Sequence, residues 1–181
     1  MANLYSVATF RTLGTAATSQ FIFSLENTTG SAVKVKIRHL LVQMDATAVL
    51  TAVMPQIKTH RASVMPGGGT SLTKVQFDTA GTASAANVVA RGATASDGGA
   101  ATAITGTAGS VAWQQYAMRL HTAVGQVLAP DNNLLPSMVD STPNDFVLNA
   151  NEAIIVQVVA AVTTSNPATN HYFVNCVWEE V

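Results

Sequence analysis

Residues 31–42 read SAVKVKIRHLLV, and this stretch decides the fold class. Apolar and basic residues alternate strictly from Val33 to Arg38, and such a period of two places successive side chains on opposite faces of a β-strand. Residues 40–42 are all apolar, which predicts that the strand becomes buried on both faces. We expect His39, on the apolar parity, to be a hydrogen-bonded residue of the core.

The same alternation recurs along the chain and predicts further short strands. They are expected at about residues 4–11, 21–26, 49–59, 71–78, 146–148, 153–162 and 172–179. Turn-forming residues separate several of them, as in NTTG at 27–30 and NANE at 149–152. Short strands with turn clusters and no long helix close into a sandwich or a barrel. We therefore predict a single all-β domain over residues 1–181, a β-sandwich of the jelly-roll kind, because several connections are too long for a simple meander.

Residues 111–121 admit two interpretations, because the apolar parity changes between Trp113 and Tyr116. A strand with a β-bulge near residues 114–115 accounts for this change. A short helix would instead align Trp113, Tyr116 and Leu120 in one stripe. We prefer the bulged strand.

A long segment of small residues departs from the strand pattern. Of the 32 residues in 79–110, 26 are Ala, Gly, Thr or Ser, and none is aromatic. Long loops without structure of their own are uncommon in compact domains and are usually functional or disordered. We predict an extended loop or arm over 79–110. It is either a mobile surface excursion or an arm that becomes ordered against a neighbouring subunit.

The chain is poor in charge, which favours assembly over an isolated existence. Only 10% of its residues are charged, against roughly 25% in typical soluble domains, and its net charge is −1. Such a surface has little electrostatic repulsion to keep copies apart, although a stable monomer with a neutral polar surface is the alternative. Nine basic residues without a cluster also argue against a nucleic-acid partner.

The residues that carry chemistry are scattered, which predicts that the chain is not an enzyme. No two of the four histidines have a spacing typical of metal sites, and no nucleophile motif is present. The glycine loop PGGGT at 66–70 is not followed by the lysine of a phosphate-binding loop. We therefore expect no cofactor and assign no catalytic, cofactor-binding or metal-binding residue.

Three residues with notable side chains are interpreted as parts of the core. Cys176 is the only cysteine, so no intrachain disulfide is possible, and its parity is that of a small buried hydrophobe. Trp113 and Trp178 fall on expected strands with apolar parity partners. Core packing is therefore preferred for both tryptophans over a role in sugar stacking.

The sequence shows no sign of a signal peptide or of a membrane span. The N-terminus lacks a basic region followed by an apolar one. The longest apolar run, near residues 153–162, is far shorter than the ~20 residues that a span needs. We expect synthesis in a cytoplasm and no membrane partner.

Two local patterns, together with the composition, carry a resemblance to a known family. They are FVLNANEAIIVQ at 146–157, an apolar strand–turn–strand hairpin, and the closing strand HYFVNCVWEE at 171–180. The sequence resembles jelly-roll capsid decoration (cement) proteins and other small virion proteins of tailed bacteriophages. Many such proteins carry glycine where this chain has Asn151. The resemblance implies a homotrimer that binds the major capsid protein or another virion protein and stabilises the shell of the virion.

Two other functions remain open. One is a carbohydrate- or receptor-binding jelly-roll module of a phage tail or fibre, which requires an exposed aromatic platform with Asn, Asp or Gln nearby. The other is a hydrolase on a β-scaffold, which requires a cleft where distant acids or histidines converge.

Overall fold

The computed structural model describes residues 3–12, 20–46, 56–63, 66–92, 104–105, 111–117, 127–128, 146–159 and 170–181, and every regular element in these ranges is a β-strand. The long strands are β1 (Asn3–Thr12), β2 (Gln20–Asn27), β3 (Val35–Ala46), β4 (Gln56–Ala62), β8 (Val88–Gly92), β10 (Val111–Ala117), β13 (Glu152–Val159) and β14 (Asn170–Glu180). The short ones are β5 (Gly67–Gly68), β6 (Thr70–Ser71), β7 (Val75–Gln76), β9 (Ile104–Thr105), β11 (Val127–Leu128) and β12 (Phe146–Leu148). The all-β prediction is confirmed.

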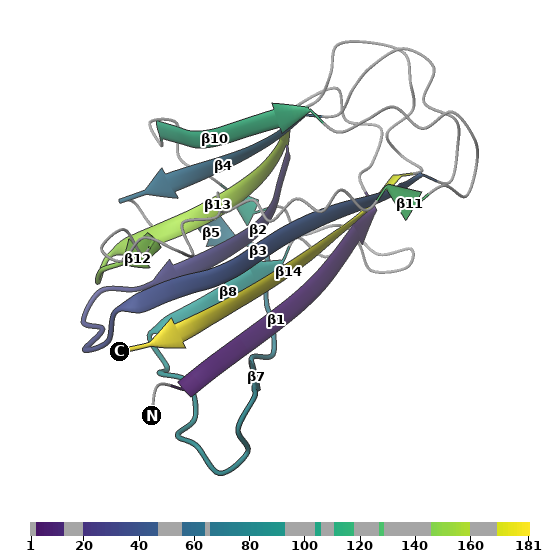
Figure 1. The fold of residues 1–181 in the computed structure, drawn as a ribbon. Coiled ribbons are helices and arrows are strands. Elements are labelled where there is room, and N and C mark those ends of the chain that lie inside the picture. The colour runs from purple at the N-terminus through teal and green to yellow at the C-terminus, as the bar shows by residue number, and fades with distance from the viewer. Residues whose placement is uncertain are drawn as a thin grey trace.

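The strands form two antiparallel sheets that lie one against the other (Figure 1). Sheet A has the order β11-β3-β14-β1-β7, with β12 also paired to β3. Sheet B has the order β10-β4-β13-β2-β8-β6, with β9 paired to β2 and β5. One hydrophobic cluster takes side chains from both sheets, including Trp178 and Val7 from sheet A and Phe23 and Ile154 from sheet B. The predicted β-sandwich is therefore confirmed.

The pairing of the strands is nested. Strand β1 pairs with β14, β2 with β13, β3 with β12 and β4 with β10. The first four long strands thus pair with later strands in reverse order along the chain, and successive pairs alternate between sheet A and sheet B. The jelly-roll assignment itself stays a prediction.

Two β-bulges explain where the sequence pattern changes phase. Strand β10 is the predicted strand, and its register with β4 shifts between Ala112 and Gln114, beside the position predicted for the bulge. The register of β14 with β3 shifts between Val177 and Trp178, opposite Arg38. This second shift moves His39 to the parity that faces away from the core, where it is half-buried. The prediction of a core position for His39 was therefore wrong.

The small-residue stretch 79–110 is interrupted by strands. Within it, β8 adds to sheet B beside β2, and Val88 and Ala90 are buried in the core. The preceding turn is held by polar contacts: Lys74 Nζ donates to the carbonyl oxygens of Ala85 at 2.8 Å and Val88 at 2.6 Å. Desolvation by burial lowers the pKa of Lys74. Residues 93–103 and 106–110 of the predicted arm lie outside the described residues.

Candidate interaction surface

The exposed apolar side chains of the described residues gather on one face. Six large hydrophobic residues are exposed in the described ranges, and five of them belong to β1, β14 and the segment around β7. These five form what we call the outer patch: Leu4, Phe10, Val75, Phe77 and Phe173. Single exposed apolar residues are normal, but several of them on one face of a sheet make that face a candidate interaction site. The outer patch is therefore the candidate functional surface.

Strand alternation and register bring the outer patch together. Because successive side chains of a strand point to opposite faces, Phe173 lies on the opposite side of β14 from the buried Tyr172 and Val174. The antiparallel register places Phe10 of β1 directly opposite Phe173. The two rings have centroids 5.5 Å apart and planes inclined by 31°, a favourable tilted contact.

A shallow hollow of about 350 Å³ lies beside this aromatic pair. Its walls come from three adjacent strands of sheet A, β1, β14 and β3, and they include Ala8, Phe10, Leu41, Gln43, Phe173 and Asn175. None of the described residues that line the hollow is charged. Towards the other end of the sheet, Arg38 Nε donates to Glu179 Oε2 at 2.8 Å. The hollow can therefore accept an apolar group without desolvating an ion.

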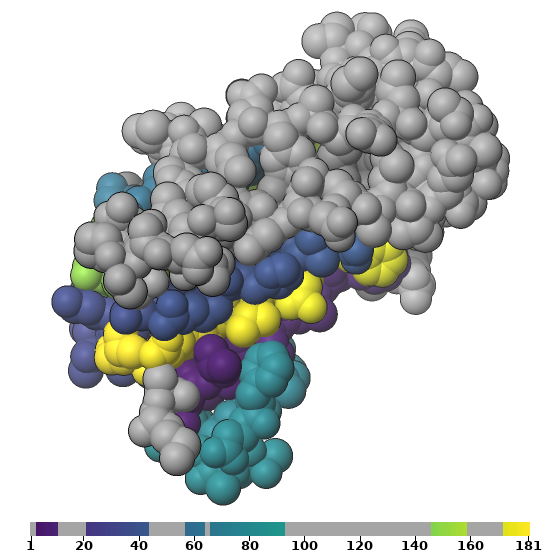
Figure 2. All heavy atoms as spheres, viewed as in Figure 1, coloured from purple at the N-terminus to yellow at the C-terminus, as the bar shows by residue number. Residues whose placement is uncertain are grey.

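The other part of the outer patch projects beyond β1. Figure 2 shows β3, β14 and β1 as adjacent blue, yellow and purple bands, with the teal segment 66–92 extending past β1. Val75 pairs with Ser6 of β1, and the backbone N–H of Phe77 donates to the carbonyl oxygen of Leu4 at 3.0 Å. Val75 is 57% exposed and Phe77 is 62% exposed. Val75 and Phe77 are thus exposed on a projection whose backbone is hydrogen-bonded to β1.

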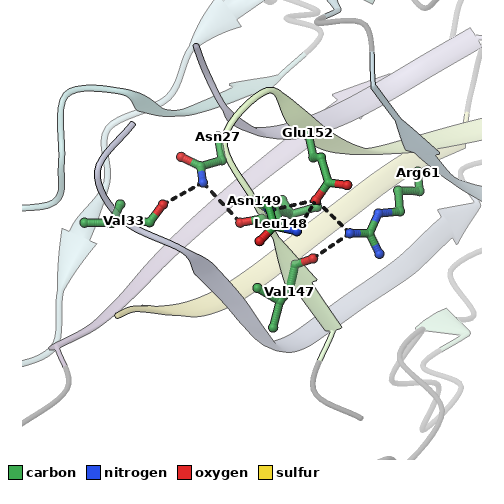
Figure 3. A network of polar contacts seen from close by, with 7 residues as sticks. All are labelled: Asn27, Val33, Arg61, Val147, Leu148, Asn149 and Glu152. Atoms are coloured by element: carbon green, nitrogen blue, oxygen red, sulfur yellow. Dashed lines mark hydrogen bonds and ion pairs between the residues drawn. The ribbon is translucent and has the colours of Figure 1, made fainter. Parts of the chain in front are cut away.

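A polar network at one end of the sandwich joins β2, β12 and β13 (Figure 3). Asn27 is fully buried, and its Nδ2 donates to the carbonyl oxygen of Val33 at 2.9 Å and to that of Leu148 at 3.1 Å. One amide group therefore fixes the turn before β3 against the end of β12. This contact is structural, because it satisfies backbone carbonyls that burial separates from water.

The same network holds the hairpin between β12 and β13 (Figure 3). Arg61 of β4 donates from Nη2 to Glu152 Oε2 at 2.7 Å and to the carbonyl oxygen of Val147 at 2.8 Å. Glu152 also accepts from the backbone N–H of Asn149 at 2.7 Å. Partial burial raises the pKa of Glu152, but these hydrogen bonds and the Arg61 charge lower it more, so the net pKa lies below its ordinary value.

The turn in this hairpin explains the asparagine in the sequence pattern. Asn151 has a φ of 66°, in the left-handed region that glycine and asparagine tolerate best. Its position is the one at which the related pattern carries glycine. Asparagine therefore meets the same backbone requirement.

Ser24 and His60 do not form a catalytic pair of the serine–histidine kind. Ser24 and His60 lie on the same rung of sheet B, but Ile155 of β13 stands between them. Two strand spacings of ~4.8 Å separate their backbones by roughly 10 Å, beyond hydrogen-bond reach. Ser24 Oγ instead donates to Glu26 Oε1 at 2.8 Å, and His60 pairs with Gln157 at 2.8 Å. These polar groups on sheet B are thus engaged with neighbours.

Cys176 and Trp178 lie in the core, as predicted. Both are fully buried, and burial raises the pKa of the Cys176 thiol well above its usual range. A protonated, inaccessible thiol is a poor nucleophile.

The other predicted core residue, Trp113, has a side chain that lies outside the described residues. Within the described ranges, no group of three or more His, Cys, Asp or Glu side chains could hold a metal ion.

Sequence reasoning missed the outer patch, because it assigned no site residues. The available signal was Phe173, an aromatic residue on the polar parity of a strand whose other parity is apolar from Tyr172 to Trp178.

The described part of the chain contains no helix of sufficient length and apolarity to cross a bilayer. Comparison with protein-family models, with curated proteins and with solved structures finds no match.

Proposed function

We propose that this chain is a virion structural protein of a bacteriophage, a decoration (cement) protein that packs as an oligomer on the capsid and stabilises the shell. Its partners are further copies of itself, in a homotrimer, and the major capsid protein or another virion protein. It is made in the host cytoplasm and acts in the virion. It performs no catalysis in this role.

The observation that carries the proposal is the outer patch, the exposed apolar part of the outer face of sheet A. The exposed parts of Phe10, Phe77 and Phe173 together equal roughly 1.4 phenylalanine side chains, or on the order of 200–350 Å². At ~25 cal/mol per Å², covering that area contributes about 5–9 kcal/mol before the costs of association. A standard interface needs roughly 800 Å² per partner. The patch can therefore supply the apolar centre of such an interface.

Two further observations support the same proposal. The nested pairing of β1–β14, β2–β13, β3–β12 and β4–β10 is the order expected when a long hairpin is wrapped into a jelly roll, an architecture used by viral capsid domains. The charged fraction of 10% leaves an exterior with little mutual repulsion between copies. Both features suit a protein that is covered by neighbours.

The proposal is tested on purified particles of the virus that encodes the chain. Quantitative mass spectrometry should detect the protein at a fixed ratio to the main shell protein. Shells assembled without it should bind the purified chain and then withstand a higher temperature before disruption. Absence from the particles, together with no binding to shells, would reject the proposal.

A carbohydrate-binding module of a tail or fibre is the second candidate. The specific observation in its favour is the Phe10–Phe173 pair with Gln43 and Asn175 at the same hollow, because aromatic rings and amides are groups that bind sugars. Trp178 does not contribute, since it is fully buried. Calorimetric titration with a panel of oligosaccharides should then give saturable binding that Phe173→Ala removes and Val181→Ser retains. No binding to any of the sugars would count against this candidate.

A further inference from the structure

The outer patch consists of two separate parts of different shape. Phe77 and Val75 stand on a projection at the edge of sheet A, and we call these two residues the knob. The hollow lies further along β1, at residues 8–10. The knob is the most exposed large apolar group in the described part of the chain, and the hollow lies on the same face of sheet A.

Hydrogen bonds fix the segment that follows the knob, residues 78–85, to itself and to β1 and β14. Tyr5 Oη donates to the carbonyl oxygen of Thr82 at 2.6 Å, and Gly81 N donates to the carbonyl oxygen of Asp78 at 3.0 Å. Ala85 N donates to Glu180 Oε2 at 2.8 Å. A segment fixed at several points loses little conformational entropy on docking, which favours its use as a contact.

The knob cannot fill the hollow of its own chain. Phe77 is bound beside Leu4, whereas the hollow reaches Phe10, six residues further along the same strand. At ~3.3 Å per residue, these positions are roughly 20 Å apart. Val75 pairs with Ser6, roughly 7 Å along β1 from Ala8 at the near end of the hollow, but β7 lies on the other side of β1 from β14 and β3, which form the other walls. The chain's own knob therefore does not occupy the hollow, and the hollow can receive the knob of another molecule.

The charge and size of the two parts suit each other. The described lining of the hollow has no charged residue, and Val75 and Phe77 bring none. A volume of about 350 Å³ is at the low end for ligand pockets, ~300–1,000 Å³, and suits a few apolar side chains rather than a large ligand. The whole chain is also poor in charge, so a second copy meets little repulsion on approach.

We propose that the occupant of the hollow is a second copy of this chain, whose Val75 and Phe77 insert beside Phe10, Leu41 and Phe173. The inference rests on the proposed oligomeric function and names the surface that forms the oligomer. Because the knob and the hollow are different patches, the contact is head-to-tail, and each copy gives one knob and receives one. Repetition of this contact closes a ring if the rotation between copies is cyclic, as the proposed homotrimer requires.

Two variants separate the two halves of the contact. Phe77→Ser removes the larger of the two apolar side chains of the knob. Ala8→Glu places a carboxylate in the hollow. Val181→Ser is the matched control, because Val181 is also an exposed hydrophobe, 48% accessible, outside both parts. Circular dichroism and thermal melting of the full-length chain establish that each variant is folded.

Sedimentation velocity over a concentration series measures the self-association. The native chain and Val181→Ser should form the same oligomer. Each of the other variants should be monomeric, with its dissociation constant raised at least about tenfold, as for a residue at the centre of an interface. An equimolar mixture of Phe77→Ser and Ala8→Glu retains one complete knob-and-hollow pair. It should therefore form a dimer that neither variant forms alone.

Three outcomes would overturn the inference. They are a native chain that is monomeric at all concentrations, an oligomer that both variants leave intact, and a mixture of the variants that stays monomeric. If the native monomer binds shells or an oligosaccharide through this face, those partners occupy the hollow instead. The proposed function is rejected by a different result: the protein forms the oligomer as expected but is absent from virus particles.

Discussion

The two faces of strand β14 both carry aromatic residues but meet different surroundings. On the inner side of β14, Tyr172, Val174 and Trp178 are buried against sheet B. On the outer side of the same strand, Phe173 is 41% exposed beside Asn175. An aromatic residue in this strand is therefore either part of the core or part of a surface, according to its parity alone.

This difference separates stability from interaction. Side chains on the inner face are already covered, so their removal leaves a cavity in the folded protein. Side chains of the outer patch become buried only when a partner binds. Substitutions on the inner face should therefore change the free energy of unfolding, and those on the outer face should change association.

The largest effect is expected from truncation of Trp178. Its ring lies 5.9 Å from that of Tyr5 and its Nε1 donates to Glu180 Oε1 at 3.1 Å. Trp178→Ala should lower the free energy of unfolding by about 3–5 kcal/mol. Phe173→Ala, on the other face of the strand, should cost about 1 kcal/mol or less in the monomer. Urea denaturation of both variants at low protein concentration makes the comparison, and equal losses would refute it.

A smaller effect is expected from a buried polar group. Asn27→Ala removes the amide that donates to the carbonyl oxygens of Val33 and Leu148. Leaving buried acceptors without a donor should lower the free energy of unfolding by about 1–3 kcal/mol. The control is Asn175→Ala on the outer face, which should change it by less than about 0.5 kcal/mol. If the Asn27 variant is as stable as this control, the network does not secure the turn.

The smallest effect is expected at the edge of the sandwich, in the partly exposed Arg61–Glu152 pair. The pKa of Glu152 is lower in the folded chain than its ordinary value of 4.5, so its contribution to stability is complete above that pH. The contribution is lost as the pH falls through the lowered folded value. Because both side chains meet solvent, the pair should contribute about 0.2–1 kcal/mol.

Substitution of Arg61 tests this pH dependence. Arg61→Gln removes the charge and a hydrogen bond that lower the pKa of Glu152, so part of the acid-dependent loss should disappear. The measurement is the urea midpoint at a series of values between about pH 3 and pH 7. Lys34→Gln removes an exposed cation elsewhere and should keep the native pH profile. Identical profiles for the native chain and the Arg61 variant would contradict the assignment.

Much of the fold could be predicted because the core strands alternate cleanly. The apolar parity of Val174, Cys176 and Trp178 correctly predicted their burial, and the phase change near Gln114 correctly predicted a bulged strand. His39 was placed on the wrong face, because the apolar run at 40–42 was interpreted as burial on both faces and not as the phase change that a bulge produces. A bulge in one strand depends on the register with its neighbour, and that register is a non-local property.

The candidate surface could not be predicted in the same way. Leu4, Phe10, Val75 and Phe173 are far apart in the sequence, and each alone is an ordinary apolar residue of a strand. Only the pairing of β1 with both β14 and β7 places them on one face. The signal for the surface is thus spatial, and no motif represents it.

The sequence alone determined that this is an all-β, charge-poor chain in which apolar and polar residues alternate along the clearest strands, because the period of two is a local property of the backbone. Tertiary structure alone decided which strands are neighbours, that β8 enters sheet B, and that a knob and a hollow share the outer face of sheet A. The physical reason is that antiparallel register joins residues more than a hundred positions apart. A local pattern sets the direction of each side chain, and long-range pairing sets its neighbours.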